Sequence, residues 1–472
     1  MTPDQEAQVL SSLYDRLFDA ITYSPPGKPT GQPAPRMLMC KNMVLNPADF
    51  ANALSPLNPG PSANQNTALA FSALVDAIPE DQPTLYIDSG RKVSDLYSGA
   101  VNGANTANKP NPAQEATYQK AFNFLNVETR ITNWDGSTSK TTGPSPIATA
   151  YANNRTSYIN AVTGYRTAYN GYDLSSPADQ RAWNAVQPAL QNNIDQAWNL
   201  WTQQGKQQVE GAQAALQSTI NDIVSAAIGQ AQGLVAPANQ LPISTGGTFL
   251  LSYALASNWM APASQASQLS LRSSFLNQTA TTDATSYSTG AGASWGLWNA
   301  GGSYAQSNEH DHQHMDSNDF SLTAELIEVR IMRPWFNPLL FSLQGWWEKG
   351  QPAGSLSAST AMPMYPTSFV VARNVALSAN FSSSDKDHIA QTISSSASAG
   401  WGPFSVSGSY SHSSSSDTFT STFDGGTLKM PGLQVIAWLN ATTPLCPPMA
   451  DPASVSATAR HASAHHEPAH QR

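Results

Sequence analysis

Small or apolar residues alternate with serine or glycine along the stretch from Gln391 to Ser413. The alternation continues on both sides of a central Gly402-Pro403 pair. Its apolar positions are Ile393, Ala397, Ala399 and Trp401 before that pair, and Phe404, Val406, Gly408 and Tyr410 after it. A period of two residues around a Gly-Pro pair predicts a β-hairpin with one weakly apolar face and one hydroxyl-lined face.

The same pattern occurs 106 residues earlier, between Tyr287 and Ser307. With this spacing, which we call the repeat offset, Trp295 aligns with Trp401, and Trp298 aligns with Phe404. The repeat offset also holds outside the hairpins for Leu269 with Val375, Leu271 with Leu377, Phe275 with Phe381, and Glu328-Val329 with Gln434-Val435. One constant offset over roughly 65 residues predicts a duplicated β-module.

Apolar residues at helical spacing dominate the first half of the chain. A stripe through Leu10, Leu13 and Leu17 predicts an N-terminal helix. Four further helices are expected over Glu115 to Thr132, Ile147 to Tyr169, Pro177 to Trp201 and Lys206 to Gly233. They form a predicted bundle whose core includes Trp183, Trp198, Leu216, Ile220 and Ile223. Its aromatic stripes are more typical of a core than of a cofactor site.

These patterns predict an α+β protein, in which an irregular N-terminal cap and a helical bundle precede a tandemly duplicated antiparallel all-β half. Residues 335–365 connect the two modules and carry a short helix through Trp346-Trp347. The C-terminal tail is rich in Pro, Ala, Ser and His, which predicts disorder. The expected domains are the cap 1–112, the bundle 113–234, the modules 246–334 and 366–440, the connection 335–365 and the tail 441–472.

Composition narrows the function classes. Only 12% of the 472 residues are charged and the net charge is −9, so a nucleic-acid partner is not expected. The first ten residues contain early acidic residues and no apolar segment, which argues against a classical secretory signal. No run of 18 apolar residues exists, so no transmembrane helix is predicted and the chain is expected to be soluble as made.

Evidence for catalytic chemistry is weak. Residues Gly292 to Gly296 match the hydrolase motif G-x-S-x-G, but they lie at the end of a hairpin strand instead of a strand-turn-helix corner. The second module has Gly400 in place of Ser294. No Walker loop, dinucleotide fingerprint or zinc-type spacing is present, so we expect a non-enzymatic protein without a cofactor.

Histidine and cysteine suggest at most weak metal binding. His310, His312 and His314 would share one face of an extended segment, which suits a divalent transition metal. The surrounding Ser, Asn and Asp residues favour a solvated loop that binds metal only incidentally. Cys40 and Cys446 are either two isolated thiols or a bridge from the N-terminal segment to the end of the β half.

The hairpins lead to the functional hypothesis. Each predicted strand has about ten residues, enough to cross a bilayer when tilted, and both hairpins lack charged residues. This pattern resembles the inserting hairpins of β-pore-forming toxins. The resemblance implies a lipid membrane as partner and homo-oligomer formation. The residues expected to contact the membrane are Trp295, Trp298, Trp401 and Phe404. A structural or ligand-binding self-assembling protein with no membrane activity is the alternative, because an ordinary antiparallel sheet can also carry one Ser-rich face.

Overall fold

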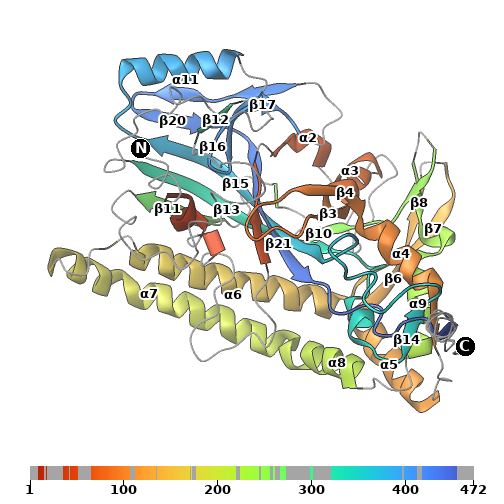
Figure 1. Ribbon diagram of the computed structural model, residues 1–472. Coiled ribbons are helices and arrows are strands. Elements are labelled where there is room, and N and C mark those ends of the chain that lie inside the picture. The colour runs from red at the N-terminus through yellow and green to blue at the C-terminus, as the bar shows by residue number, and fades with distance from the viewer. Residues whose placement is uncertain are drawn as a thin grey trace, which may run out of the picture.

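The computed structural model describes most of the chain and confirms the α+β class (Figure 1). The described residues are 9–14, 17–18, 36–41, 43–50, 65–106, 112–133, 135–170, 172, 177–218, 224–243, 246–255, 259–260, 266–272, 298–300, 320–395, 398–411 and 417–453.

An antiparallel sheet forms the centre of the molecule. Its strand order is β1 (Arg36–Met39), β21 (Leu433–Thr442), β15 (Met364–Ser378), β13 (Ser321–Met332) and β10 (Tyr253–Leu255). Four shorter strands join it: β2 (Val44–Leu45), β11 (Ser267–Arg272), β19 (Thr422–Asp424) and β20 (Thr427–Met430). The residues expected to form a separate N-terminal cap therefore contribute β1 and β2 to this sheet, paired with β21.

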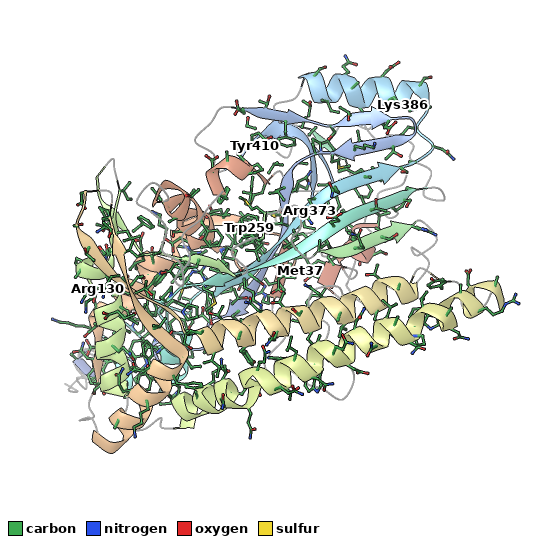
Figure 2. The ribbon with its side chains drawn as sticks, turned by 180° about the vertical axis from the view of Figure 1, so that it is seen from behind. Met37, Arg130, Trp259, Arg373, Lys386 and Tyr410 are labelled. Atoms are coloured by element: carbon green, nitrogen blue, oxygen red, sulfur yellow. The ribbon has the colours of Figure 1, made fainter. Side chains whose placement is uncertain are left out.

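A second, smaller sheet lies near one end of the central sheet (Figure 1). Its order is β12 (Trp298–Ala300), β16 (Ala399–Trp401), β17 (Phe404–Ser409) and β18 (Thr418–Thr420). Helix α11 (Ser383–Ser395) lies beside it (Figure 1). Figure 2 places Lys386 of α11 at the opposite end of the molecule from Arg130.

Both faces of the central sheet are buried. On β13, Leu322, Ala324 and Leu326 join an apolar cluster with the N-terminal helix and the small sheet. On the opposite face, Ile327 and Val329 pack with residues of α2 (Pro47–Phe50) and α3 (Gln65–Asp76) and with Trp259. This division follows from the alternation of side chains along a strand.

Helices α6 (Pro146–Asn170) and α7 (Pro177–Trp201) form a long antiparallel hairpin beneath the sheet, with α6 on the side of β11 (Figure 1). The Thr167 hydroxyl donates to the Gln268 carbonyl of β11 over 3.0 Å. The other helices are α4 (Val93–Gly103), α5 (Pro112–Leu125), α8 (Gln207–Ser218) and α9 (Val224–Val235). The remaining strand pairs are β3 (Ala77–Pro79) with β4 (Asp88–Lys92), β5 (Ala104–Thr106) with β14 (Trp346–Glu348), β6 (Asn126–Thr132) with β7 (Thr138–Pro144), and β8 (Leu241–Pro242) with β9 (Thr248–Phe249).

Within the predicted bundle, the first helix is shorter than expected. Helix α5 ends at Leu125, where the Asn126 side chain donates to the Phe122 carbonyl. The next seven residues form β6, and Ile131 of this strand is buried beside Tyr253. The prediction of one helix from Glu115 to Thr132 was therefore wrong, because β-branched residues favour a strand here once Ile131 has an apolar partner.

Of the expected fourth helix, the structure describes α8 and α9, with residues 219–223 outside the described part, and α8 follows a kink at Gln204 and Gly205. Trp183 and Leu216 are buried as predicted, and Trp198 is half-buried. Ile220 and Ile223 lie outside the described residues. The predicted helix through Trp346-Trp347 was wrong as well: Pro338–Ser342 is a short 3-10 helix, and Trp346 begins β14.

Part of the predicted disordered tail is folded. Cys446 is fully buried, and a carboxylate oxygen of Asp451 accepts a hydrogen bond from the Gly350 backbone over 2.7 Å. The chain is therefore fixed to the connecting segment through residue 453, and the residues after it lie outside the described part.

Candidate functional site

The tip of the Ser-rich hairpin is the candidate site. Strands β16 and β17 pair antiparallel around Gly402-Pro403, with Trp401 opposite Phe404. Gly402 has a φ of +55°, a left-handed conformation that glycine adopts without strain. The rings of Trp401 and Phe404 stack with centroids 6.3 Å apart. The predicted turn is therefore present, although its first strand is much shorter than expected.

Helix α11 replaces the first five residues of that strand, 391–395. It extends to Ser395, so only Ala399 to Trp401 pair with β17. Ile389 is buried in the cluster beneath the small sheet, and Ile393 packs against it. Two residues four positions apart share a face in a helix and also in a strand. The sequence pattern therefore could not separate the two structures here, and the expectation of a ten-residue strand was wrong for this conformation.

The aromatic tip is buried. Trp401 and Phe404 both have 0% exposure in this fold, whereas their expected contact with a membrane stays a prediction. They pack in one apolar cluster with Leu10 and Leu13 of the N-terminal helix. The physical reason is a partner nearly four hundred residues away in the sequence, which local alternation cannot reveal. Trp346 belongs to a different apolar cluster from these two rings.

Gln434 of β21 connects the small sheet to the central sheet. Its side-chain oxygen accepts a hydrogen bond from the Ser405 backbone over 2.7 Å, and its amide nitrogen donates to the Ser405 carbonyl over 3.1 Å. Both residues are fully buried. The amide group thus occupies the place of a neighbouring strand at the edge of β17, and it satisfies backbone groups that would otherwise be buried without partners.

The register of one strand pair in the central sheet is consistent with the pairing at this tip. Strands β15 and β20 pair in a register that sets Val375 opposite Met430 and Leu377 opposite Leu428. Continuing the same register along both strands brings Trp401 opposite Phe404, which is the pairing found in the hairpin. We call the connecting residues 379–426 segment B; Gly402-Pro403 is its midpoint.

The β11–β13 pair repeats this arrangement. Leu269 lies opposite Ala324 and Leu271 opposite Leu322, and each pair precedes its counterpart in β15–β20 by the repeat offset. We call residues 273–320 segment A; it is equal in length to segment B. Continuing the β11–β13 register would set Trp295 opposite Trp298. Trp295 lies outside the described residues, and the backbone of Trp298 pairs with Trp401.

Glu328 of β13 occupies the position that Gln434 has in β21, one repeat offset later. Ser368 donates a hydrogen bond to its carboxylate over 2.8 Å, and the Arg330 side chain lies 3.7 Å away. Burial raises the pKa of Glu328, whereas Ser368 and the charge of Arg155 on α6 lower it. The repeat offset aligns these two polar positions in the sequence, but the alignment alone does not indicate which buried contacts they make.

A buried ionisable group on α3 has a structural role. Asp76 accepts hydrogen bonds from the backbone and hydroxyl of Ser94 over 2.8 and 2.5 Å at the start of α4. Burial raises the pKa of Asp76. Arg333 is buried close by and donates to the carbonyls of Val75 and Pro366. These contacts join α3, α4 and the sheet.

The remaining predicted residues are not brought to this site. His310, His312 and His314 lie outside the described residues, as does the Gly292–Gly296 motif. Among the residues that the structure describes, no three His, Cys, Asp or Glu side chains gather to hold a metal ion. Cys40 and Cys446 are both free and buried, in different apolar clusters, so the bridge considered from the sequence does not form.

Comparison with known proteins identifies no relative. No family model, curated protein or solved structure matches the chain. Within the described part, none of the helices is both long and apolar enough to cross a membrane.

Proposed function

We propose that the protein is a non-enzymatic, membrane-interacting pore-former. In this proposal, segments A and B extend the strand pairs β11–β13 and β15–β20 into long hairpins, segment B by leaving its folded position, and several copies assemble through them. The observation that carries the proposal is that the register of β15–β20, continued residue by residue along both sides of segment B, sets Trp401 opposite Phe404, the two residues that pair at the turn. A hairpin built by extension therefore ends at the turn that already exists.

The same proposal includes duplication of the β half. Its support is the equal pairing of β11 with β13 and of β15 with β20 at the one repeat offset. A duplication preserves such a register because each strand pair and its connecting segment are copied together. Two similar hairpins in one chain would also double the number of strands that each copy brings to an assembly.

The segments are long enough to cross a bilayer. Each extended strand of segment B would have 23 residues, from 379 to 401 and from 404 to 426, or about 75 Å. Residues 389–416 contain no Asp, Glu, Lys or Arg, which leaves 13 uncharged residues on each side of the turn. A tilted membrane strand needs only about 9–11 residues. The alternation of aromatic or small residues with serine then provides a lipid face and a lumen face.

Release of segment B has a clear energetic cost. Trp401, Phe404 and Val406 are fully buried, and exposure of each large apolar side chain costs about 1.5–3 kcal/mol. Lipid contact offsets this loss, and strand pairing between copies satisfies the new hairpin edges. Membrane contact by these aromatic residues would therefore follow their release and would not precede it.

A reversible crosslink tests the proposal. Residues Leu45 and Ser411 are bridge partners, and the Ser411 backbone donates to the Val44 carbonyl over 2.7 Å. Cα atoms of bridge partners lie within the span of a disulfide, so a Leu45→Cys/Ser411→Cys variant should link the end of the hairpin to the central sheet. We expect the oxidised variant to release no dye from phosphatidylcholine vesicles, and the same sample to regain activity on reduction.

The reduced variant is the matched control, because it carries the same substitutions without the crosslink. Wild-type protein treated with the oxidant controls for the native thiols. Equal dye release by the oxidised and reduced variant would refute extension of segment B. Absence of release by every form, with or without anionic lipid in the vesicles, would refute membrane activity.

The second candidate is a structural or ligand-binding self-assembling protein. Full burial of Trp401 and Phe404 favours it, since these rings already have protein partners. In that case the crosslink would leave assembly unchanged, and light scattering would detect self-association without vesicles.

A further inference from the structure

The N-terminal helix is enclosed by the rest of the protein. Residues 9–14 and 17–18 are helical, and Val9, Leu10, Leu13 and Leu17 all have 0% exposure. Ser11 and Ser12 are buried as well, so the helix is enclosed on more than its apolar stripe. We propose that this helix, the N-terminal plug, is an autoinhibitory element that holds segment B in its folded position. The inference rests on the proposed pore-forming function.

The plug contacts the tip at its turn. A Cβ atom built on Gly402 would lie 3.6 Å from side-chain carbons of both Leu10 and Leu13. Trp401 and Phe404 belong to the same apolar cluster as these leucines. This turn is the midpoint of segment B, and an extended hairpin would carry it farthest from the sheet. The plug therefore contacts the part of segment B that would move the greatest distance in the proposed extension.

The plug also holds the part of the molecule that stays in place. The Tyr14 hydroxyl donates to the Met37 carbonyl of β1 over 2.9 Å. Met37 and Met39 share the apolar cluster with the plug leucines, and β1 pairs with β21 in the central sheet. One helix thus bridges a fixed strand and a movable turn. Extension of segment B breaks the second contact, and removal of the plug makes that step easier.

Displacement of the plug has a specific consequence for the tip. When the plug moves away, Trp401 and Phe404 lose their apolar contacts with Leu10 and Leu13. A weaker plug therefore lowers the free energy needed to release Trp401 and Phe404 from the fold. The plug affects the rate at which the tip opens, and it leaves the strand register that guides the hairpin unchanged. It is a regulatory contact for the same site.

Truncation of one plug leucine tests the inference. Leu13→Ala removes a side chain from the plug, and Leu340→Ala removes the same side chain from a separate apolar cluster, where Leu340 also has 0% exposure. Full burial of a leucine contributes more than the free energy of a tenfold change. We expect Leu13→Ala to release dye from phosphatidylcholine vesicles at least about tenfold faster than wild type, and Leu340→Ala to match wild type. Equal, measurable rates of dye release for the two variants would overturn the inference.

Hydrogen exchange provides a readout that needs no membrane. In solution, the backbone amides of Trp401 and residues 404–409 should exchange at least about tenfold faster in Leu13→Ala than in Leu340→Ala at matched global stability. Tyr14→Phe keeps the ring and removes the bond to Met37, so it should show the same trend if Leu13→Ala fails to fold. Selective exchange without dye release from any form supports the plug and refutes the pore. Dye release with no selective exchange refutes the plug alone.

Discussion

Replacement of Gln434 tests the connection between the two sheets. Gln434→Met keeps a long unbranched side chain of similar volume and removes both hydrogen bonds to Ser405. The Ser405 N–H and C=O then remain buried without those partners. Each orphaned group costs about 1–3 kcal/mol, so the free energy of unfolding should fall by about 2–6 kcal/mol. This loss is a large fraction of the total stability of a typical domain, about 5–15 kcal/mol.

Urea denaturation followed by tryptophan fluorescence measures this loss. Hydrogen exchange of β17 should show where the stability is lost, because without the Gln434–Ser405 hydrogen bonds the small sheet opens before the central sheet. Gln434→Glu is a useful companion: it keeps the acceptor for the Ser405 N–H, loses the donor to the carbonyl and places a carboxylate in a buried position. A loss below about 1 kcal/mol for Gln434→Met, with unchanged exchange in β17, would refute the assigned role of these bonds.

Three further predictions concern other parts of the fold. Burial raises the pKa of Glu328, so the stability that this residue contributes is present below its unfolded pKa and is lost as the pH rises through its folded pKa. The free energy of unfolding of Glu328→Gln should therefore rise relative to that of wild type between about pH 4 and about pH 8. A difference between the two proteins that stays constant over this range would contradict the reasoning. Burial also raises the pKa of the Cys40 thiol, which donates to the Val435 carbonyl over 2.8 Å, so the native protein should resist thiol alkylation at this residue until it unfolds, as mass spectrometry of labelled peptides would show. Gly205→Ala should lower the free energy of unfolding by at least about 2 kcal/mol, because the residue has a φ of +95° and its Cβ would lie 2.7 Å from Ile147; Gly164→Ala, inside α6 with nothing within 4 Å, should be neutral or stabilising in the same assay.

Sequence patterns predicted an element correctly where the spacing of apolar residues fits a helix or a strand but not both. The N-terminal stripe at Leu10, Leu13 and Leu17 is compatible only with a helix, and these residues are helical and buried. Spacings of four residues were ambiguous, as at Ile389 and Ile393 in α11 or Val127 and Ile131 in β6, because they fit one face of either structure. The surroundings of each segment decided the outcome, and those surroundings come from distant parts of the chain.

The sequence predicted the turn of the candidate site but not the burial of its aromatic residues. Gly402-Pro403 identified the turn through local alternation, and the repeat offset matches the pairing of the sheet strands. Burial of Trp401 depends on Leu10 and Leu13, a contact that no periodicity encodes. The polar match of Glu328 with Gln434 was visible in the sequence, yet it required the structure to show which backbone groups Gln434 satisfies.

Equal length of segments A and B has a consequence for how the chain tolerates change. Each segment joins two strands whose register is fixed by the apolar faces of the central sheet, so one added residue would move its midpoint off the turn and reverse the faces beyond it. Paired additions on both sides of the midpoint would keep the faces and lengthen the hairpin. Under the proposed extension, segments A and B would therefore reach the same distance beyond the sheet.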